Sequence, residues 1–235
     1  MSRVLVIGDL HAPCMHERYL DFVQEVEEKY ATNRVVLIGD VADNHLCSLH
    51  PKEHDALSPK VEAEQAKQQI QQVYKLYPSA KVCIGNHDIR AQLRAAEVSM
   101  PTVYLKTYNQ VWKTPGWDWE NEHAIEGVLY VHGTGSSGKN AALTNAQANM
   151  MNLVQGHTHA YAGVQWFAGP RQAIFGLNVG CGLDPRSYGA RYGINLRTRP
   201  VLGCGVVIDG EEAYFVKMDL GRKAQAAKHG RYGRK

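Results

Sequence analysis

Five short apolar runs recur along the first two thirds of the chain, and each ends beside a glycine with a polar neighbour. The runs are nearly continuous and rich in β-branched residues, which predicts strands that are buried on both faces. The predicted strands are Arg3–Ile7, Arg34–Ile38, Lys81–Ile84, Val128–Val131 and Asn152–Gln155.

Two longer segments between the first three runs repeat apolar residues every three or four positions, with polar residues between them. This period predicts amphipathic helices over His16–Ala31 and Pro59–Tyr77. Because strand, helix and strand alternate, we expect parallel βαβ units and an α/β fold.

After about residue 160 the pattern changes to strands joined by turns, with Asp209-Gly210 as a hairpin signal. We expect these strands to form a second, mostly antiparallel or mixed sheet that packs on the first. They are predicted at Gly163–Ala168, Gln172–Val179, Pro200–Ile208 and Glu212–Met218.

The length of 235 residues fits one domain, which we expect over residues 1–220. An aromatic-rich insertion around residues 100–125 holds three of the four tryptophans, and we expect it to be either a lid or a cover for the core. Five widely spaced cysteines, an odd number, argue against a disulfide framework. The sequence shows neither a signal peptide nor an apolar run of about 20 residues, so a cytoplasmic location is expected and membrane binding is not.

The net charge of +3 hides an uneven distribution. Residues 221–235 contain six of the 26 basic residues and no acid, which leaves 20 basic against 23 acidic residues in the rest of the chain. Such a tail is either a flexible arm for a polyanion or a solvated terminus that aids solubility.

Polar residues with metal-binding side chains stand at the ends of the first five predicted strands. In an α/β sheet, ligands gather beyond the carboxyl ends of the strands, so we expect these side chains to converge. Oxygen and nitrogen donors without sulfur suit manganese, iron or zinc rather than a cysteine-type structural zinc site. The candidate ligands are Asp9, His11, Asp40, Asn86, His132, His157 and His159.

This series resembles the five-part signature of the calcineurin-like metallophosphoesterases, and the match spans Asp9 to His159. The resemblance implies a two-sheet αββα sandwich of the metallophosphoesterase type. The motifs around Asn178-Val-Gly-Cys-Gly and Leu202-Gly-Cys-Gly are also similar to those of small phage-encoded members, for which the host cytoplasm would be the location. The motifs that carry the resemblance are Asp9-Leu-His11, Gly39-Asp40-Val-Ala-Asp43, Gly85-Asn86-His87-Asp88, His132-Gly133 and Gly156-His157-Thr-His159.

The family pattern implies a role for each matched residue. It assigns one metal to Asp9, His11 and His159, and the other to Asn86, His132 and His157, with Asp40 bridging both. Two divalent ions are expected, with Mn²⁺ first and Fe, Zn, Ni or Mg as alternatives. A hydroxide shared by the two ions would attack phosphorus. His87 would protonate the leaving group, and Asp43 would orient His87, unless Asp43 is a turn or cap residue.

The substrate class depends on the two residues directly after the second aspartate of the Gly-Asp loop. Protein phosphatases of this superfamily have Arg-Gly there, whereas this chain has Asn44-His45. We therefore expect a phosphodiesterase or nuclease that cuts DNA or RNA, with nucleic acid as the partner. Asn44, His45 and Arg90 are the candidate substrate-binding residues, and tryptophans of the insertion could stack on bases. The alternatives are a broad phosphomonoesterase for small substrates and a non-catalytic nucleic-acid-binding subunit; the oligomeric state stays open.

Overall fold

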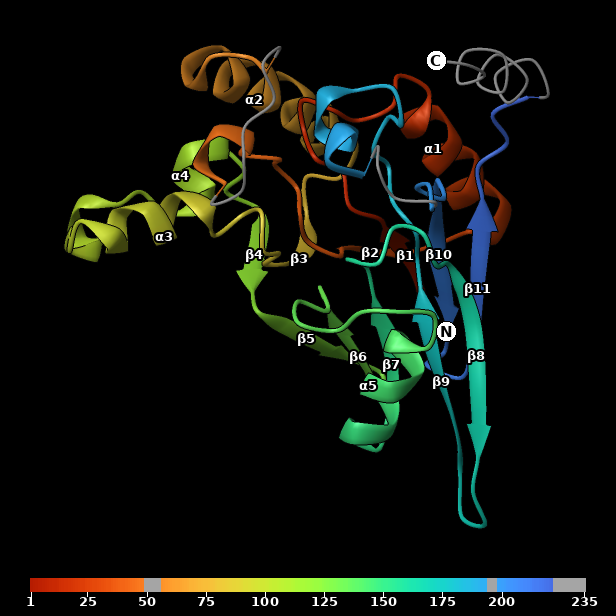
Figure 1. The fold of residues 1–235 in the computed structure, drawn as a ribbon. Coiled ribbons are helices and arrows are strands. Elements are labelled where there is room, and N and C mark those ends of the chain that lie inside the picture. Colours follow the sequence, from red (N-terminus) through yellow and green to blue (C-terminus); the bar gives the residue numbers. More distant parts are fainter. Residues whose placement is uncertain (49–55, 194–197, 222–235) are drawn as a thin grey trace, which may run out of the picture.

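Two β-sheets pack face to face, and helices cover their outer faces (Figure 1). This computed structural model describes residues 1–48, 56–193 and 198–221. The predicted two-sheet αββα sandwich is confirmed. The predicted basic tail lies outside the described residues, apart from residue 221.

The first sheet has the strand order β11–β10–β1–β2–β3–β4 within the described residues. β1 to β4 are parallel, while β10 runs antiparallel to β1 and β11 antiparallel to β10. The bounds are β1 (Arg3–Ile7), β2 (Arg34–Leu37), β3 (Ala80–Cys83), β4 (Trp117–Glu120), β10 (Gly203–Ile208) and β11 (Glu212–Lys217).

The second sheet has the order β5–β6–β7–β9–β8 in the same part of the chain. β6, β7 and β9 are parallel, and β5 and β8 are antiparallel edge strands. The bounds are β5 (Glu122–Ile125), β6 (Val128–Val131), β7 (Asn152–Gln155), β8 (Gly163–Ala168) and β9 (Ala173–Asn178).

The helices lie on both outer faces of the sandwich, with α1 and α2 on the side of the first sheet and α5 on the second (Figure 1). Within the described ranges, none is long and apolar enough to cross a membrane. The bounds are α1 (Tyr19–Tyr30), α2 (Pro59–Leu76), α3 (Arg90–Glu97), α4 (Tyr108–Trp112), α5 (Ala141–Asn149), and the short 3₁₀ turns η1 (His45–Cys47), η2 (Thr102–Tyr104) and η3 (Tyr188–Gly193).

The alternation of side chains along β1 shows why its whole sequence is apolar. Val4 and Val6 point into the core between the two sheets, where they join Tyr130 and Phe175 of the second sheet. Leu5 and its alternating neighbour Ile7 point the other way, into the core beneath α1 and α2. Both faces of the central strands are therefore buried, as the continuous apolar runs predict.

The allocation of strands to sheets differs from the prediction. β10 and β11 join the first sheet, whereas β6 and β7 belong to the second together with β8 and β9. An apolar run records burial but not which neighbour it pairs with, so the sequence pattern does not distinguish these two arrangements.

The tryptophans of the segment around residues 100–125 lie in the sheet and the core rather than in a lid. Trp117 begins β4, which pairs with β3, and the residue is 2% exposed. Trp112 is also buried, and Trp119 stacks on Tyr108 with 4.6 Å between ring centroids. Because these rings are already packed within the protein, the expected stacking of bases on this segment is not supported.

Gly176 of β9 provides a test of how α5 sits on the second sheet. A Cβ atom at this position would lie 2.3 Å from the backbone nitrogen of Leu143 and 2.4 Å from the carbonyl carbon of Ala142. We expect Gly176→Ala to lower the free energy of unfolding by ~1–3 kcal/mol, seen as a fall in Tm of ~3–10 °C. Gly169→Ala is the matched control, because its Cβ would meet no atom closer than 3.8 Å. Equal Tm shifts for the two variants would contradict this packing.

Candidate metal centre

Loops that follow the carboxyl ends of β1, β2, β3, β6 and β7 meet at one place. The backbone N–H of His87 donates to Asp40 Oδ1 at 2.7 Å, and that of His11 donates to the Asp40 carbonyl at 2.9 Å. The backbone N–H of His157 donates to Asp9 Oδ2 at 2.8 Å. These hydrogen bonds join loops from distant parts of the sequence and direct their side chains towards a common point.

The predicted ligands are brought together in overlapping groups. One group contains Asp9, His11, Asp40 and His159, and a second contains Asp40, His132 and His157, with all ligand atoms of a group within 4.8 Å of one another. Asp40 belongs to both groups, which is what a bridging ligand requires. Asn86 joins the second group, since its Oδ1 lies 3.0 Å from His132 Nε2.

Hydrogen bonds to Nδ1 orient two of the histidine rings for metal binding. His132 Nδ1 lies 3.0 Å from the Ile38 carbonyl, and His11 Nδ1 lies 2.8 Å from Asp43 Oδ1. Both oxygens are acceptors, so Nδ1 carries a proton in each ring and Nε2 is the nitrogen that is left to bind a metal ion. Such a second partner fixes the tautomer of a ligating histidine.

Candidate ligand atoms face one another in the centre. His11 Nε2 lies 3.1 Å from His159 Nε2, His132 Nε2 lies 3.2 Å from Asp40 Oδ2, and the buried Asp9 Oδ1 makes no hydrogen bond. Converging oxygen and nitrogen atoms, without sulfur, form a donor set suited to divalent cations. The residues therefore fit the two metal ions that the family pattern implies.

The electrostatics of the centre also favour cations. Burial opposes ionisation of Asp40, but His132 and His87 outweigh it and hold its pKa well below the usual range. Burial likewise opposes protonation of His132, yet Asp40 and Asp9 raise its pKa to about 10. The same negative potential that holds a proton on a buried imidazole would attract metal ions.

Three candidate ligands have strained backbones. The φ angles of His11, Asp40 and His157 are 51°, 47° and 65°, in the left-handed region that non-glycine residues seldom adopt. Such strain clusters at functional sites, where surrounding contacts hold it in place. Here it turns each side chain inwards directly after its strand.

Two glycines are required by the close approach of the carboxylates. A Cβ at Gly85 would lie 2.1 Å from Asp40 Oδ1, and a Cβ at Gly156 would lie 2.1 Å from Asp9 Oδ1. Any side chain there would displace the two acidic ligands, which explains the glycine before each of these ligand motifs.

The expected acid pair is close in space, but it has a further neighbour. His87 Nδ1 lies 3.1 Å from Asp43 Oδ1, while His87 Nε2 lies 2.9 Å from Arg90 Nη2. Burial opposes protonation of His87, but Asp40 and Asp43 outweigh it and raise its pKa. Since Asp43 Oδ1 also binds His11, this carboxylate orients a candidate ligand as well as the candidate acid.

The three candidate substrate residues have different surroundings. Arg90 reaches the acid pair directly, and its Nη1 also donates to the Asp43 carbonyl at 2.7 Å. Asn44 Nδ2 donates to the His87 carbonyl at 3.0 Å, so its amide supports the loop. His45 is buried, with its backbone N–H donating to Glu62 Oε1 at 2.7 Å and its ring against Tyr188.

Two residues without a predicted role hold these loops. Asp88 accepts the backbone N–H groups of Gly85 at 2.9 Å and Ala42 at 3.1 Å, which ties two ligand loops together. Burial and Asp40 raise its pKa to about 7. Asn178, at the end of β9, contacts the Thr158 hydroxyl and donates to the Gly156 carbonyl at 3.3 Å. Its position at a strand end beside a glycine motif was the available signal.

The shared position of Asp40 leads to a prediction about metal content. We expect Asp40→Asn to lose both metal ions, because the substitution removes one charge from both ligand groups while Asn Oδ1 can still accept from His87. Elemental analysis of the purified protein measures this. Asp118→Asn, at an exposed ion pair with Lys81, is the control and should keep two ions per chain. Normal metal content in Asp40→Asn would refute the bridging role.

Several solved structures are similar to this chain. Vps29 from Cryptosporidium parvum is 14% identical, with 93% of this chain and 98% of that chain covered and a TM-score of 0.46. The phosphoesterase YfcE from E. coli is 15% identical, with 93% and 100% covered and a TM-score of 0.41. Nuclease MPE from Pseudomonas putida is 10% identical, with 92% and 86% covered and a TM-score of 0.37.

The chain has no match among curated proteins. The profile of the calcineurin-like phosphoesterases matches residues 2–196, which is most of the sequence and includes every candidate ligand. The chain therefore belongs to the calcineurin-like phosphoesterase family and is a metal-dependent hydrolase of phosphoester bonds.

Proposed function

We propose that this enzyme is a phosphodiesterase that cuts nucleotide phosphodiester bonds, in DNA, RNA or smaller nucleotides. The observation that carries the proposal is the side chain directly after Asp43. Asn44 stands there instead of a cationic residue, and its amide donates to the His87 carbonyl. A phosphomonoester carries between one and two negative charges at neutral pH, whereas a diester phosphate carries one. A site with less fixed positive charge is better matched to the diester.

Arg90 is the one guanidinium among the described residues that contacts the candidate acid pair. Its charge would neutralise a non-bridging oxygen of the phosphate, for which a planar guanidinium is well suited. Because Arg90 donates to His87 Nε2, that nitrogen is an acceptor in this arrangement. Movement of the guanidinium onto the phosphate would release Nε2 and leave it able to carry a proton.

The remaining side chains then have distinct tasks in hydrolysis. Bound dications lower the pKa of water and neutralise charge on phosphoryl oxygens. Asp9, His11 and His159 would hold one ion, Asn86, His132 and His157 the other, with Asp40 shared. Asp43 would hold His87 through Nδ1, so that Nε2 faces the leaving oxygen and gives up its proton as the ester bond breaks.

The choice of metal and partner belongs to the same proposal. The mixed carboxylate, amide and imidazole donors favour Mn²⁺, and they are also compatible with iron or zinc. Nucleic acid is the proposed partner. A broad phosphomonoesterase is the alternative, since the metal ions together with Arg90 could also bind a terminal phosphate.

Two chromogenic substrates separate these alternatives. With Mn²⁺ bound, we expect a higher kcat/KM for bis-p-nitrophenyl phosphate than for p-nitrophenyl phosphate, because the diester needs less positive charge. Release of p-nitrophenolate measures both reactions in the same assay. Faster turnover of the monoester would favour the phosphomonoesterase and contradict the phosphodiesterase proposal.

The role of His87 can be separated from metal binding. We expect His87→Asn to keep two metal ions and to lower kcat by ~10²–10⁴-fold for a dinucleotide, because its alkoxide leaving group needs a proton whereas p-nitrophenolate does not. Metal analysis and steady-state kinetics on one preparation measure both effects. His16→Asn, a buried histidine outside the ligand groups, should keep normal kcat. An unchanged kcat in His87→Asn would remove His87 from the mechanism.

A further inference from the structure

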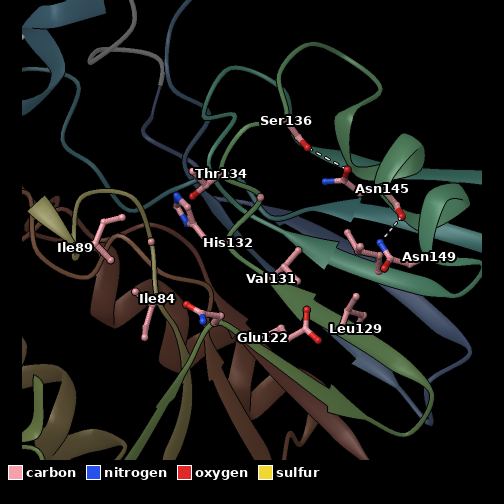
Figure 2. A pocket seen from close by; sticks show the side chains of 14 residues that line it. Ile84, Ile89, Glu122, Leu129, Val131, His132, Thr134, Ser136, Asn145 and Asn149 are labelled. Atoms are coloured by element: carbon pink, nitrogen blue, oxygen red, sulfur yellow. Dashed lines mark hydrogen bonds between the residues drawn. The ribbon is translucent and has the colours of Figure 1, made fainter. Parts of the chain in front are cut away.

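A cleft of about 420 Å³ opens beside the metal centre, and the proposed hydrolysis assigns it no task (Figure 2). His132 and Gly85 are among the residues that line it. His132 is a candidate metal ligand, and Gly85 directly precedes Asn86, so the cleft adjoins the place where the phosphate would lie. Its volume falls in the range of about 300–1,000 Å³ that is typical of small-ligand sites.

The floor of the cleft follows from the alternation of side chains on β6. Val128 and Tyr130 point into the core between the sheets, so Leu129 and Val131 point to the outer face of the second sheet. On that face α5 packs mainly on β7, β8 and β9. The outer face of β6 is therefore only partly covered, and its apolar side chains line the cleft.

A second apolar wall comes from the loop after β3. Ile84 and Ile89 lie across the cleft from Leu129 and Val131, as Figure 2 shows. Aliphatic side chains on two opposing sides form a slot that suits a flat ring, whose faces are apolar. Burial of such a ring would add binding energy that the phosphate alone does not have.

Neutral polar groups form the rim. Asn145 is held in place, since it accepts from Ser136 Oγ at 3.0 Å and donates to Gln155 Oε1 at 2.8 Å. Asn121 and Asn149 are exposed at the same rim. Amide groups both donate and accept hydrogen bonds, which is what the edge of a nucleobase requires.

The charge of the lining argues against a second phosphate. Glu122 is an acid, and no lysine or arginine is present among the lining residues. An additional phosphate in the cleft would meet a carboxylate without a compensating cation. A neutral ring with polar edges meets no such penalty.

We propose that the cleft binds the nucleobase of the nucleotide whose phosphate lies at the metal centre. This inference rests on the proposed phosphodiesterase function and narrows its substrate class. A base inside a duplex cannot enter such a slot without leaving the stack. The substrate is therefore a free nucleotide ester or a single strand, in which bases are accessible.

Binding measurements test the cleft without relying on catalysis. Calorimetry on the Mn²⁺-loaded protein compares thymidine 5′-monophosphate with inorganic phosphate. We expect the nucleotide to bind ~10–100-fold more tightly, the gain expected when the apolar faces of one base are buried between aliphatic side chains. Asn121→Trp, which fills the cleft from its exposed rim, should remove this advantage and leave phosphate binding unchanged.

Two further variants complete the test. Asn149→Trp fills the cleft from α5 and should act like Asn121→Trp, while Gln147→Trp, exposed on the same helix but outside the lining, should keep the full advantage. If one of the two filled variants no longer binds phosphate, that variant is misfolded. The comparison of nucleotide with phosphate then rests on the other filled variant. Equal affinities for nucleotide and phosphate in the natural protein would overturn the proposal, as would an advantage that survives both filled variants. Failure of diester hydrolysis with the binding advantage intact would reject the proposed function alone.

Discussion

The carboxylate of Asp40 lies where loops from four different strands must meet. The backbone carbonyl of Asp40 accepts from the backbone N–H of His11, and Asp40 Oδ1 accepts from that of His87. Asp40 Oδ2 lies 3.2 Å from His132 Nε2. Burying this charge is costly unless other groups compensate it, and the surrounding imidazoles keep it ionised. The other ligands, the glycines and the strained backbones surround this buried carboxylate.

The sandwich makes that convergence feasible because it buries both faces of its central strands. β1 and β2 contribute to two separate cores, one between the sheets and one beneath the helices. Rigid, doubly packed strands can hold left-handed loop residues that would be unfavourable in a flexible loop. The packing of the two sheets thus holds the strained backbone at the metal centre in place. The outer face of β6 is only partly covered, which leaves the cleft beside the centre open.

Hydrogen bonds around the centre couple the candidate ligands to the candidate acid. Asp43 binds both His11 and His87, so one carboxylate sets the orientation of a ligand and of a proton donor. Arg90 adds a positive charge at the far nitrogen of His87. A phosphate that attracts Arg90 would change the protonation of His87 as it binds, which links substrate binding to readiness for the chemical step.

By itself, the sequence determined the α/β class, most of the strands, the ligand motifs and the family. Periodic apolar positions, and glycines followed by polar residues at strand ends, are local features of the chain. The grouping of strands into sheets, the burial of Trp112 and Trp117, the contact of Arg90 with His87 and the cleft beside His132 were decided by the tertiary structure. Each of these depends on which distant segments become neighbours. A one-dimensional pattern records that a residue is buried or polar, but not what it will contact.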